Sequence, residues 1–270
     1  MTAREALGSH WPEYLIEGWA LGTFMISAGI VATLLGSPNS PVGMAITDPM
    51  LRNVVGGVAM GLTAIALIHS PWGKRSGAHM NPAVTLTFLR LRKIHGWDAV
   101  FFIAAQTLGG TAGVLVVAAL FGSAFTDAPV SYAATMPGAG GPWIAFIAEL
   151  LISGALMFVI LTLSGTARLA RFTGYAAGCL VALYIAFESP LSGMSMNPAR
   201  TFASAVPGMH WDNFWIYLCA PLFGMLAGAQ LYLTVRGVQR LACAKLLHPK
   251  EERCIHCGYE PTHTDRGLET

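Results

Sequence analysis

The sequence predicts an all-α membrane protein, with six transmembrane helices and two half-helices in an inverted 3+3 repeat around a central pore. The first observation is composition: 54% of the 270 residues are hydrophobic and only 11% are charged, whereas a soluble domain carries about 25% charged residues. The second is a phrase that occurs twice, as SGAHMNPA at residues 76–83 and SGMSMNPA at residues 192–199. The third is a set of six long apolar runs, three in each half of the chain.

In the first half, apolar runs at about 14–35, 53–69 and 99–121 are long enough to cross a bilayer. The segment 82–91, which follows the first copy of the phrase, is apolar but too short to span a hydrocarbon core of roughly 30 Å. It is therefore predicted to be a half-helix that neighbouring helices protect or that lines a cavity.

The second half repeats this plan, with apolar runs at about 143–163, 174–187 and 211–235 and a short segment at 198–206. Three spans is an odd number, so the two halves must be inverted relative to each other. The two half-helices then enter from opposite faces and meet near the midplane, a pattern typical of permeation sites.

The domain division follows from this pattern. Residues 1–237 form a channel domain with repeats at about 12–121 and 143–235, and residues 238–270 form a cytoplasmic tail.

The basic residues predict the orientation. Apart from Arg52 and Arg200, every Lys and Arg falls on one side of this topology, and the loops 36–50 and 122–142 carry none. By the positive-inside rule both termini are cytoplasmic. We expect a multi-pass protein of the plasma or inner membrane, in contact with the lipid bilayer and with no nucleic-acid partner.

Each copy of the phrase reads as a helix start, because Asn is a favoured N-cap and Pro is tolerated at the first helical position. Two helix N-termini at one place would direct two positive dipole ends at the same point. The six residues that form these predicted starts are Asn81, Pro82, Ala83, Asn197, Pro198 and Ala199.

The doubled Asn-Pro-Ala phrase, the paired Glu17 and Glu149, and Arg200 directly after the second phrase resemble the aquaporin/glycerol-facilitator family, the major intrinsic proteins. One Asn-Pro-Ala is common by chance, but two copies at corresponding places in an inverted repeat are highly specific. The resemblance covers roughly residues 12–237. It implies a pore in each monomer, a homotetramer, and passive passage of water, small neutral solutes or both, with protons and ions excluded.

The resemblance also implies residue roles. The side-chain amides of Asn81 and Asn197 would donate hydrogen bonds into the lumen. Glu17 and Glu149 would be buried structural acids that accept backbone N–H groups, a role we favour over a proton relay because irregular backbone at membrane depth needs internal partners. Backbone groups of five residues would line the pore: Gly77, Ala78, His79, Gly193 and Ser195.

The selectivity filter is where the chain departs from its relatives. Carried over from the resemblance by spacing from the second phrase, the four constriction positions would be Met60, Ile185, Met194 and Arg200, with Gly61 as the alternative to Met60. Water channels of the family have Phe, His, Cys and Arg there, and glycerol channels tend to have two aromatics, Gly and Arg. This chain matches neither set, so we expect a more apolar and wider aperture around the one fixed cation.

Other positions resemble the water-channel branch. Thr201 and Ala205 are of the water-channel type, and Tyr217 is aromatic as expected, although Leu218 replaces the expected Trp.

The leading prediction is therefore a passive channel, and two alternatives stay open: a glycerol-, urea- or metalloid-type facilitator with little water flux, and a coupled secondary transporter. An enzyme is not expected, because the bundle carries no cluster of nucleophile, base or metal ligands, and no cofactor is implied.

The tail holds Cys254 and Cys257 with His248 and His263 nearby. One Cys-x-x-Cys supplies two of the four ligands of a structural zinc ion. We favour incidental thiols and expect no metal, with metal binding and redox sensing left open.

Overall fold

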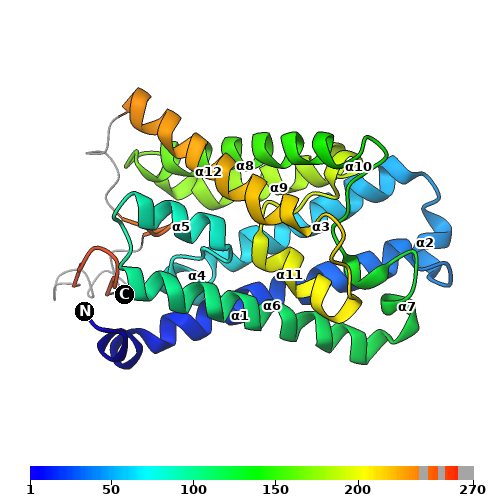
Figure 1. The fold of residues 1–270 in the computed structure, drawn as a ribbon, viewed down its shortest axis with the longest axis horizontal. Coiled ribbons are helices and arrows are strands. Elements are labelled where there is room, and N and C mark those ends of the chain that lie inside the picture. Colours follow the sequence, from blue (N-terminus) through cyan, green and yellow to red (C-terminus); the bar gives the residue numbers. More distant parts are fainter. Residues whose placement is uncertain (237–242, 249–252, 261–270) are drawn as a thin grey trace, which may run out of the picture.

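The computed structural model describes residues 1–236, 243–248 and 253–260, and within them it is helical with no strand (Figure 1). Six helices are long and apolar enough to cross a membrane, as predicted. They are α1 (Ala3–Gly36), α3 (Pro49–His69), α6 (Gly96–Phe121), α8 (Pro142–Ser164), the span Ala170–Phe187, which contains α9 (Thr173–Phe187), and α12 (Phe214–Arg236).

Two short helices follow the two copies of the phrase, as predicted. They are α5 (Pro82–Arg90) and α11 (Pro198–Gly208). Six minor elements complete the described chain: α2 (Pro41–Ala45), α4 (Pro71–Ser76), α7 (Ser123–Thr126), η1 (Ser131–Ala133), η2 (Ala170–Phe172) and α10 (Ser189–Ser192).

The same local signal starts several of these helices. A capping side chain stands directly before a proline, which suits the first helical position because it has no N–H to satisfy. Asp48 accepts from Leu51 N at 2.7 Å at the start of α3, and Ser70 accepts from Gly73 N at 2.9 Å at the start of α4. The asparagines of the two phrases start α5 and α11 in the same way.

The two halves pack as an inverted repeat. Helix α1 lies along α6 as α8 lies along α12, α3 packs against α9 across the two halves, and each half-helix touches the last long helix of the other half. Glycines permit the closest approaches: a Cβ added at Gly228 would lie 2.2 Å from the carbonyl oxygen of Gly154. The start of α1 and the end of α12 lie at one end of the bundle, and α2 and α7 lie at the other (Figure 1).

Candidate pore

A cavity of about 400 Å³ lies between the two halves. Its lining comes from α1, α3, α8, α9 and the two phrase loops. Ten of the predicted site residues line it: Met60, Ala78, His79, Asn81, Ile185, Gly193, Met194, Ser195, Asn197 and Arg200. The other predicted site residues, Glu17, Gly77, Pro82, Ala83, Glu149, Pro198 and Ala199, are not part of this lining.

The two phrases hold each other across the cavity. Asn81 Nδ2 donates to the carbonyl of Met196 at 2.7 Å, and Asn197 Nδ2 donates to the carbonyl of Met80 at 2.7 Å. Each side-chain oxygen meanwhile caps its own half-helix, with Ala83 N at 2.8 Å from Asn81 Oδ1 and Ala199 N at 3.1 Å from Asn197 Oδ1. An amide has two N–H groups, so each asparagine keeps one beyond this cross-link.

Two buried carboxylates organise the loops that lead into the half-helices. Glu17 accepts from the Ser76 hydroxyl at 2.8 Å, from His79 N at 3.0 Å and from Met80 N at 2.7 Å, with Gln106 Nε2 as a fourth donor at 2.8 Å. These bonds give partners to N–H groups of the loop, which have no hydrogen-bond partner within a helix.

Glu149 does the same in the other half. It accepts from the Ser192 hydroxyl at 2.9 Å, from Ser195 N at 2.6 Å and from Met196 N at 2.7 Å. Both glutamates therefore accept backbone N–H groups of the loops that carry the two phrases.

The same loops contain strained backbone. Ala78, Met80, Met194 and Met196 all have positive φ, between 49° and 54°. Non-glycine residues rarely adopt this left-handed conformation, and it persists only where the surroundings enforce it. The N–H groups of Met80 and Met196 donate to the two glutamates, so the carboxylates help to hold the loops in this form.

Arg200 lies in the first turn of α11, and its side chain is part of the cavity lining. Its Nη1 donates to the carbonyl of Ala133 at 3.0 Å and to the hydroxyl of Thr135. Both partners come from the segment between α7 and α8, so this loop fixes the one cation of the predicted filter.

The structure separates the two candidates for the first filter position. Met60 lines the cavity, where the Ser27 hydroxyl contacts its sulfur at 3.8 Å. Gly61 instead faces α9, because an added Cβ would lie 2.6 Å from the carbonyl oxygen of Gly178.

Comparisons with known proteins agree with this geometry. The family model described as "Major intrinsic protein" matches residues 12–232. The chain belongs to the major intrinsic protein family. It is a membrane channel of that family and not an enzyme.

Among its relatives, "Aquaporin NIP1-3" of Oryza sativa subsp. japonica is 34% identical over 80% of this chain and 71% of the relative. "Probable aquaporin NIP4-2" of Arabidopsis thaliana is 36% identical over 80% of this chain and 72% of the relative. In fold, the chain is similar to the "aquaglyceroporin from Plasmodium falciparum", with a TM-score of 0.67, 24% identity, and coverage of 83% of this chain and 96% of that one.

The sequence reasoning missed a stripe of lining residues on α1. Leu21, Phe24, Ala28, Val31 and Leu35 all line the channel cavity. They continue from Glu17 in alternating steps of four and three residues, the spacing of one helix face. This stripe was the signal that could have found them.

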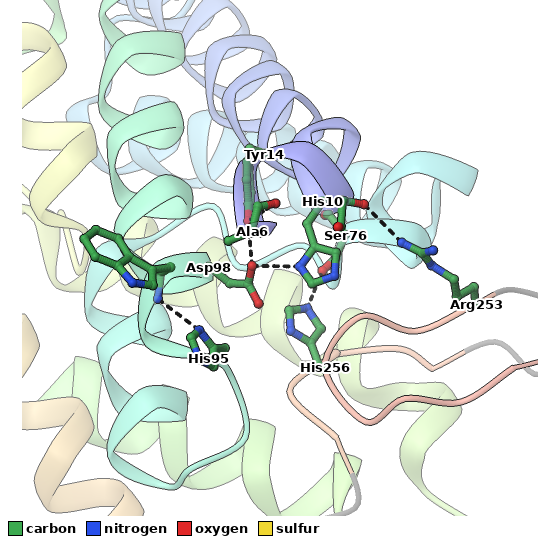
Figure 2. A network of polar contacts seen from close by, with 10 residues as sticks. Ala6, His10, Tyr14, Ser76, His95, Asp98, Arg253 and His256 are labelled. Carbon is green, nitrogen blue, oxygen red and sulfur yellow. Dashed lines mark hydrogen bonds and ion pairs between the residues drawn. The ribbon is translucent and has the colours of Figure 1, made fainter. Parts of the chain in front are cut away.

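The tail is the second difference from expectation. Its described residues, 243–248 and 253–260, which we call the C-terminal cap, lie against the first phrase loop rather than apart from the channel. Arg253 donates to the carbonyl of Ser9, and His256 Nε2 donates to the carbonyl of Ser76 at 2.9 Å (Figure 2). Burial, with a smaller contribution from the neighbouring His79, lowers the pKa of His256 to about 4. His263, named above as a candidate ligand, lies outside the described residues.

The bundle beneath the cap has its own polar network. Figure 2 shows His10 and Tyr14 of α1 converging on Asp98 of α6, at 2.8 Å and 2.5 Å. Asp98 and Tyr14 are buried, so these bonds tie α1 to α6 close to the site where the cap lies.

Proposed function

We propose that this channel carries small neutral solutes alongside water and excludes protons and cations. The constriction consists of Met60, Ile185, Met194 and Arg200. The observation that carries the proposal is the cavity lining itself, in which these four residues combine one anchored guanidinium with three apolar walls.

Charge exclusion has two sources. The N-termini of α5 and α11 meet at the cross-linked asparagines, and their dipole ends are unfavourable for a cation. Arg200 adds a full positive charge at the filter, the arrangement that pores use against cations and protons. A cation would therefore meet an unfavourable potential in two places.

Passage of neutral solutes follows from the apolar walls. Water that crosses such a ring loses hydrogen bonds with few partners to replace them, and each unreplaced bond costs on the order of 1–3 kcal/mol. A small solute rests its carbon surface on Met and Ile while its polar groups turn to Arg200. Methionine side chains change rotamer easily, so a sharp size limit is not expected.

We further propose a homotetramer in the plasma or inner membrane, with both termini in the cytoplasm. The distribution of Lys and Arg, and the position of the start of α1 and the end of α12 at one end of the bundle, support this orientation. Large exposed apolar side chains along the long helices, such as Leu62 at 60% and Leu120 at 70% exposure, suit contact with lipid or with another copy.

Osmotic swelling of proteoliposomes with water, glycerol and urea tests the proposal. The wild type should pass all three, and Ile185→His should shift the ratio of water to solute flux towards water because it restores a polar wall. Ile185→Val is the matched control, since it keeps the wall apolar. Rapid water flux with outright rejection of every solute would refute the apolar-filter argument.

A further inference from the structure

Four side chains of the C-terminal cap converge on one point. They are Cys243, His248, Cys254 and Cys257, and their ligand atoms all lie within 4.8 Å of one another. Sγ of Cys243 is 3.3 Å from Sγ of Cys254, and Nε2 of His248 is 3.2 Å from Sγ of Cys257. Around tetrahedral zinc, with bonds of about 2.1–2.3 Å, ligand atoms lie roughly 3.5–3.8 Å apart. The cluster therefore has both the composition and the size of a closed Cys₃His site.

Backbone groups surround the sulfurs as expected around thiolates. The backbone N–H groups of Lys245, Cys257 and Tyr259 lie beside the sulfurs of Cys243, Cys254 and Cys257 respectively, where they favour the thiolate forms. Gly258 follows the second pair of cysteines with a φ of 71°, and its N–H donates to the carbonyl of Cys254 at 3.0 Å. Such outer contacts orient metal ligands and tune their basicity.

The local charge also suits a bound metal. Three thiolates, a neutral imidazole and Zn²⁺ leave a net charge of −1. The Lys245 side chain is buried at 2% exposure, and its ammonium has no hydrogen-bond partner among the described residues. It interacts electrostatically with Cys254, so it is placed to balance this charge. A buried cation without such a partner would be costly.

The cluster is joined to the mouth of the pore. Leu246 N donates to the carbonyl of Gly77 at 3.2 Å, and His79 Nε2 donates to the carbonyl of Ala244 at 2.8 Å. Leu246 itself lines the channel cavity, and it packs in the same apolar cluster as Ala78. Figure 2 shows His256 beside Ser76 at the same place. The segment that supplies Cys243 and His248 thus lies across the end of the pore that the first phrase lines.

We propose that Cys243, His248, Cys254 and Cys257 bind one Zn²⁺ ion, and that the metal-bound cap covers the inner mouth of the pore and lowers flux. The second part rests on the proposed channel function; the first does not. This inference differs from the sequence-based expectation of incidental thiols, which had only Cys254 and Cys257 as a paired motif.

The choice of zinc follows from the ligands. Thiolate and imidazole suit Zn²⁺ and exclude Mg²⁺ and Ca²⁺, which take oxygen ligands. Four protein ligands leave no open coordination position, so the site is structural. Because zinc binds the assembled cap, it shifts the population towards the covered mouth.

Direct metal binding is the first test. Purified full-length protein, reduced and stripped with a chelator, is titrated with Zn²⁺, and with Co²⁺ as a spectroscopic probe. We expect one ion per chain and the absorption of tetrahedral cobalt with thiolate ligands. Cys254→Ser combined with Cys257→Ser should abolish both. Cys219→Ser, in α12, is the matched control and should bind as the wild type does. An absence of stoichiometric binding, or a Cys243–Cys254 disulfide in its place under reducing conditions, would overturn the metal site.

Flux is the second test. Wild type loaded with Zn²⁺ before reconstitution is compared with the stripped protein and with the double serine variant. If zinc keeps about 90% of the mouths covered, stripping raises water and solute flux about tenfold. The double variant should start at the higher flux and not respond to zinc, and Cys219→Ser should respond fully. Stoichiometric binding with unchanged flux would refute the cap's effect on flux and leave the metal site standing. Flux in the stripped protein no greater than in protein-free vesicles would instead count against the channel proposal, whatever the metal binding shows.

Discussion

The two halves of the channel share one scaffold and differ in what stands at each mouth. In both, a buried glutamate holds a strained loop, an asparagine caps a half-helix, and the loop cross-links to its counterpart. Past the second phrase stands Arg200, while Val84 holds the corresponding place in the first. The first loop carries His79, which bonds to the cap, where the second carries Ser195. The repeat thus supplies the frame of a pore, and the selectivity and closure that we propose come from positions where the two halves differ.

The largest expected effect is a loss of folded protein when either of the two loop-holding glutamates, which both halves share, is replaced. Glu17→Gln and Glu149→Gln each replace a carboxylate oxygen by an amide donor that faces buried N–H groups. Each donor left unsatisfied costs about 1–3 kcal/mol, so both variants should give little folded protein. Glu17→Gln should be the worse, since Glu17 has four donors and Glu149 three.

Thermal unfolding and size-exclusion yield in detergent measure this effect. The control is Asp212→Asn on the exposed surface. Wild-type stability in both glutamine variants would show that the carboxylates do not hold the loops.

The next largest expected effect, on cation leak, concerns the mouth at which Arg200 stands. Arg200→Val makes the second phrase like the first at this position. At an effective dielectric constant of about 20 and a separation of about 7 Å, one charge contributes roughly 2 kcal/mol to a cation barrier. Cation leak should therefore rise roughly 30-fold.

Sodium leak from proteoliposomes is the measurement for Arg200→Val. Arg200→Lys keeps the positive charge, so its sodium leak should stay as low as that of the wild type. Equal leak in Arg200→Val and wild type would mean that the dipole ends alone exclude cations.

A smaller effect is expected at the cross-linked asparagines. Asn81→Leu and Asn197→Leu each remove a helix cap, worth about 1 kcal/mol, and a donor in the cavity lining. Asn197 caps both Ala199 N and Arg200 N, whereas Asn81 caps only Ala83 N, so Asn197→Leu should lose more flux. The measurement is flux per folded channel, and exposed Asn39→Leu is the control. Undiminished flux in both Asn81→Leu and Asn197→Leu would show that the asparagines do not take part in permeation.

The smallest expected effect, a modest rise in flux, concerns the mouth of the pore beside the C-terminal cap. His79→Ser gives the first loop the residue of the second and removes the bond to Ala244. One hydrogen bond contributes about 1 kcal/mol net, so flux of the zinc-loaded channel should rise only a few-fold. Exposed His95→Ser is the control, and a flux unchanged by His79→Ser would show that this bond does not hold the cap.

How far the sequence predicted these features depends on whether they are local. The half-helices and the asparagine caps follow from short-range signals that occur twice, whereas the role of the two buried glutamates is implied by the resemblance to the family. Met60 follows from helical spacing, because Gly56, Met60, Ala64 and Ile68 share the lining face of α3.

The remaining features depend on contacts between distant parts of the chain. Arg200 is anchored by Ala133 and Thr135, from a loop without hydrophobic periodicity. Cys243 and His248 join the Cys254–Cys257 pair only because the tail folds back on the first phrase loop. Sequence spacing alone shows neither arrangement.

We propose that a pore for neutral solutes runs between the two halves and is closed to cations. The most direct test is stopped-flow light scattering on vesicles with the reduced, zinc-stripped protein, under gradients of sucrose, urea and NaCl. We expect fast water efflux and re-swelling with urea, and no re-swelling with NaCl on the same time scale. Re-swelling with NaCl as fast as with urea, or no acceleration over protein-free vesicles, would contradict it.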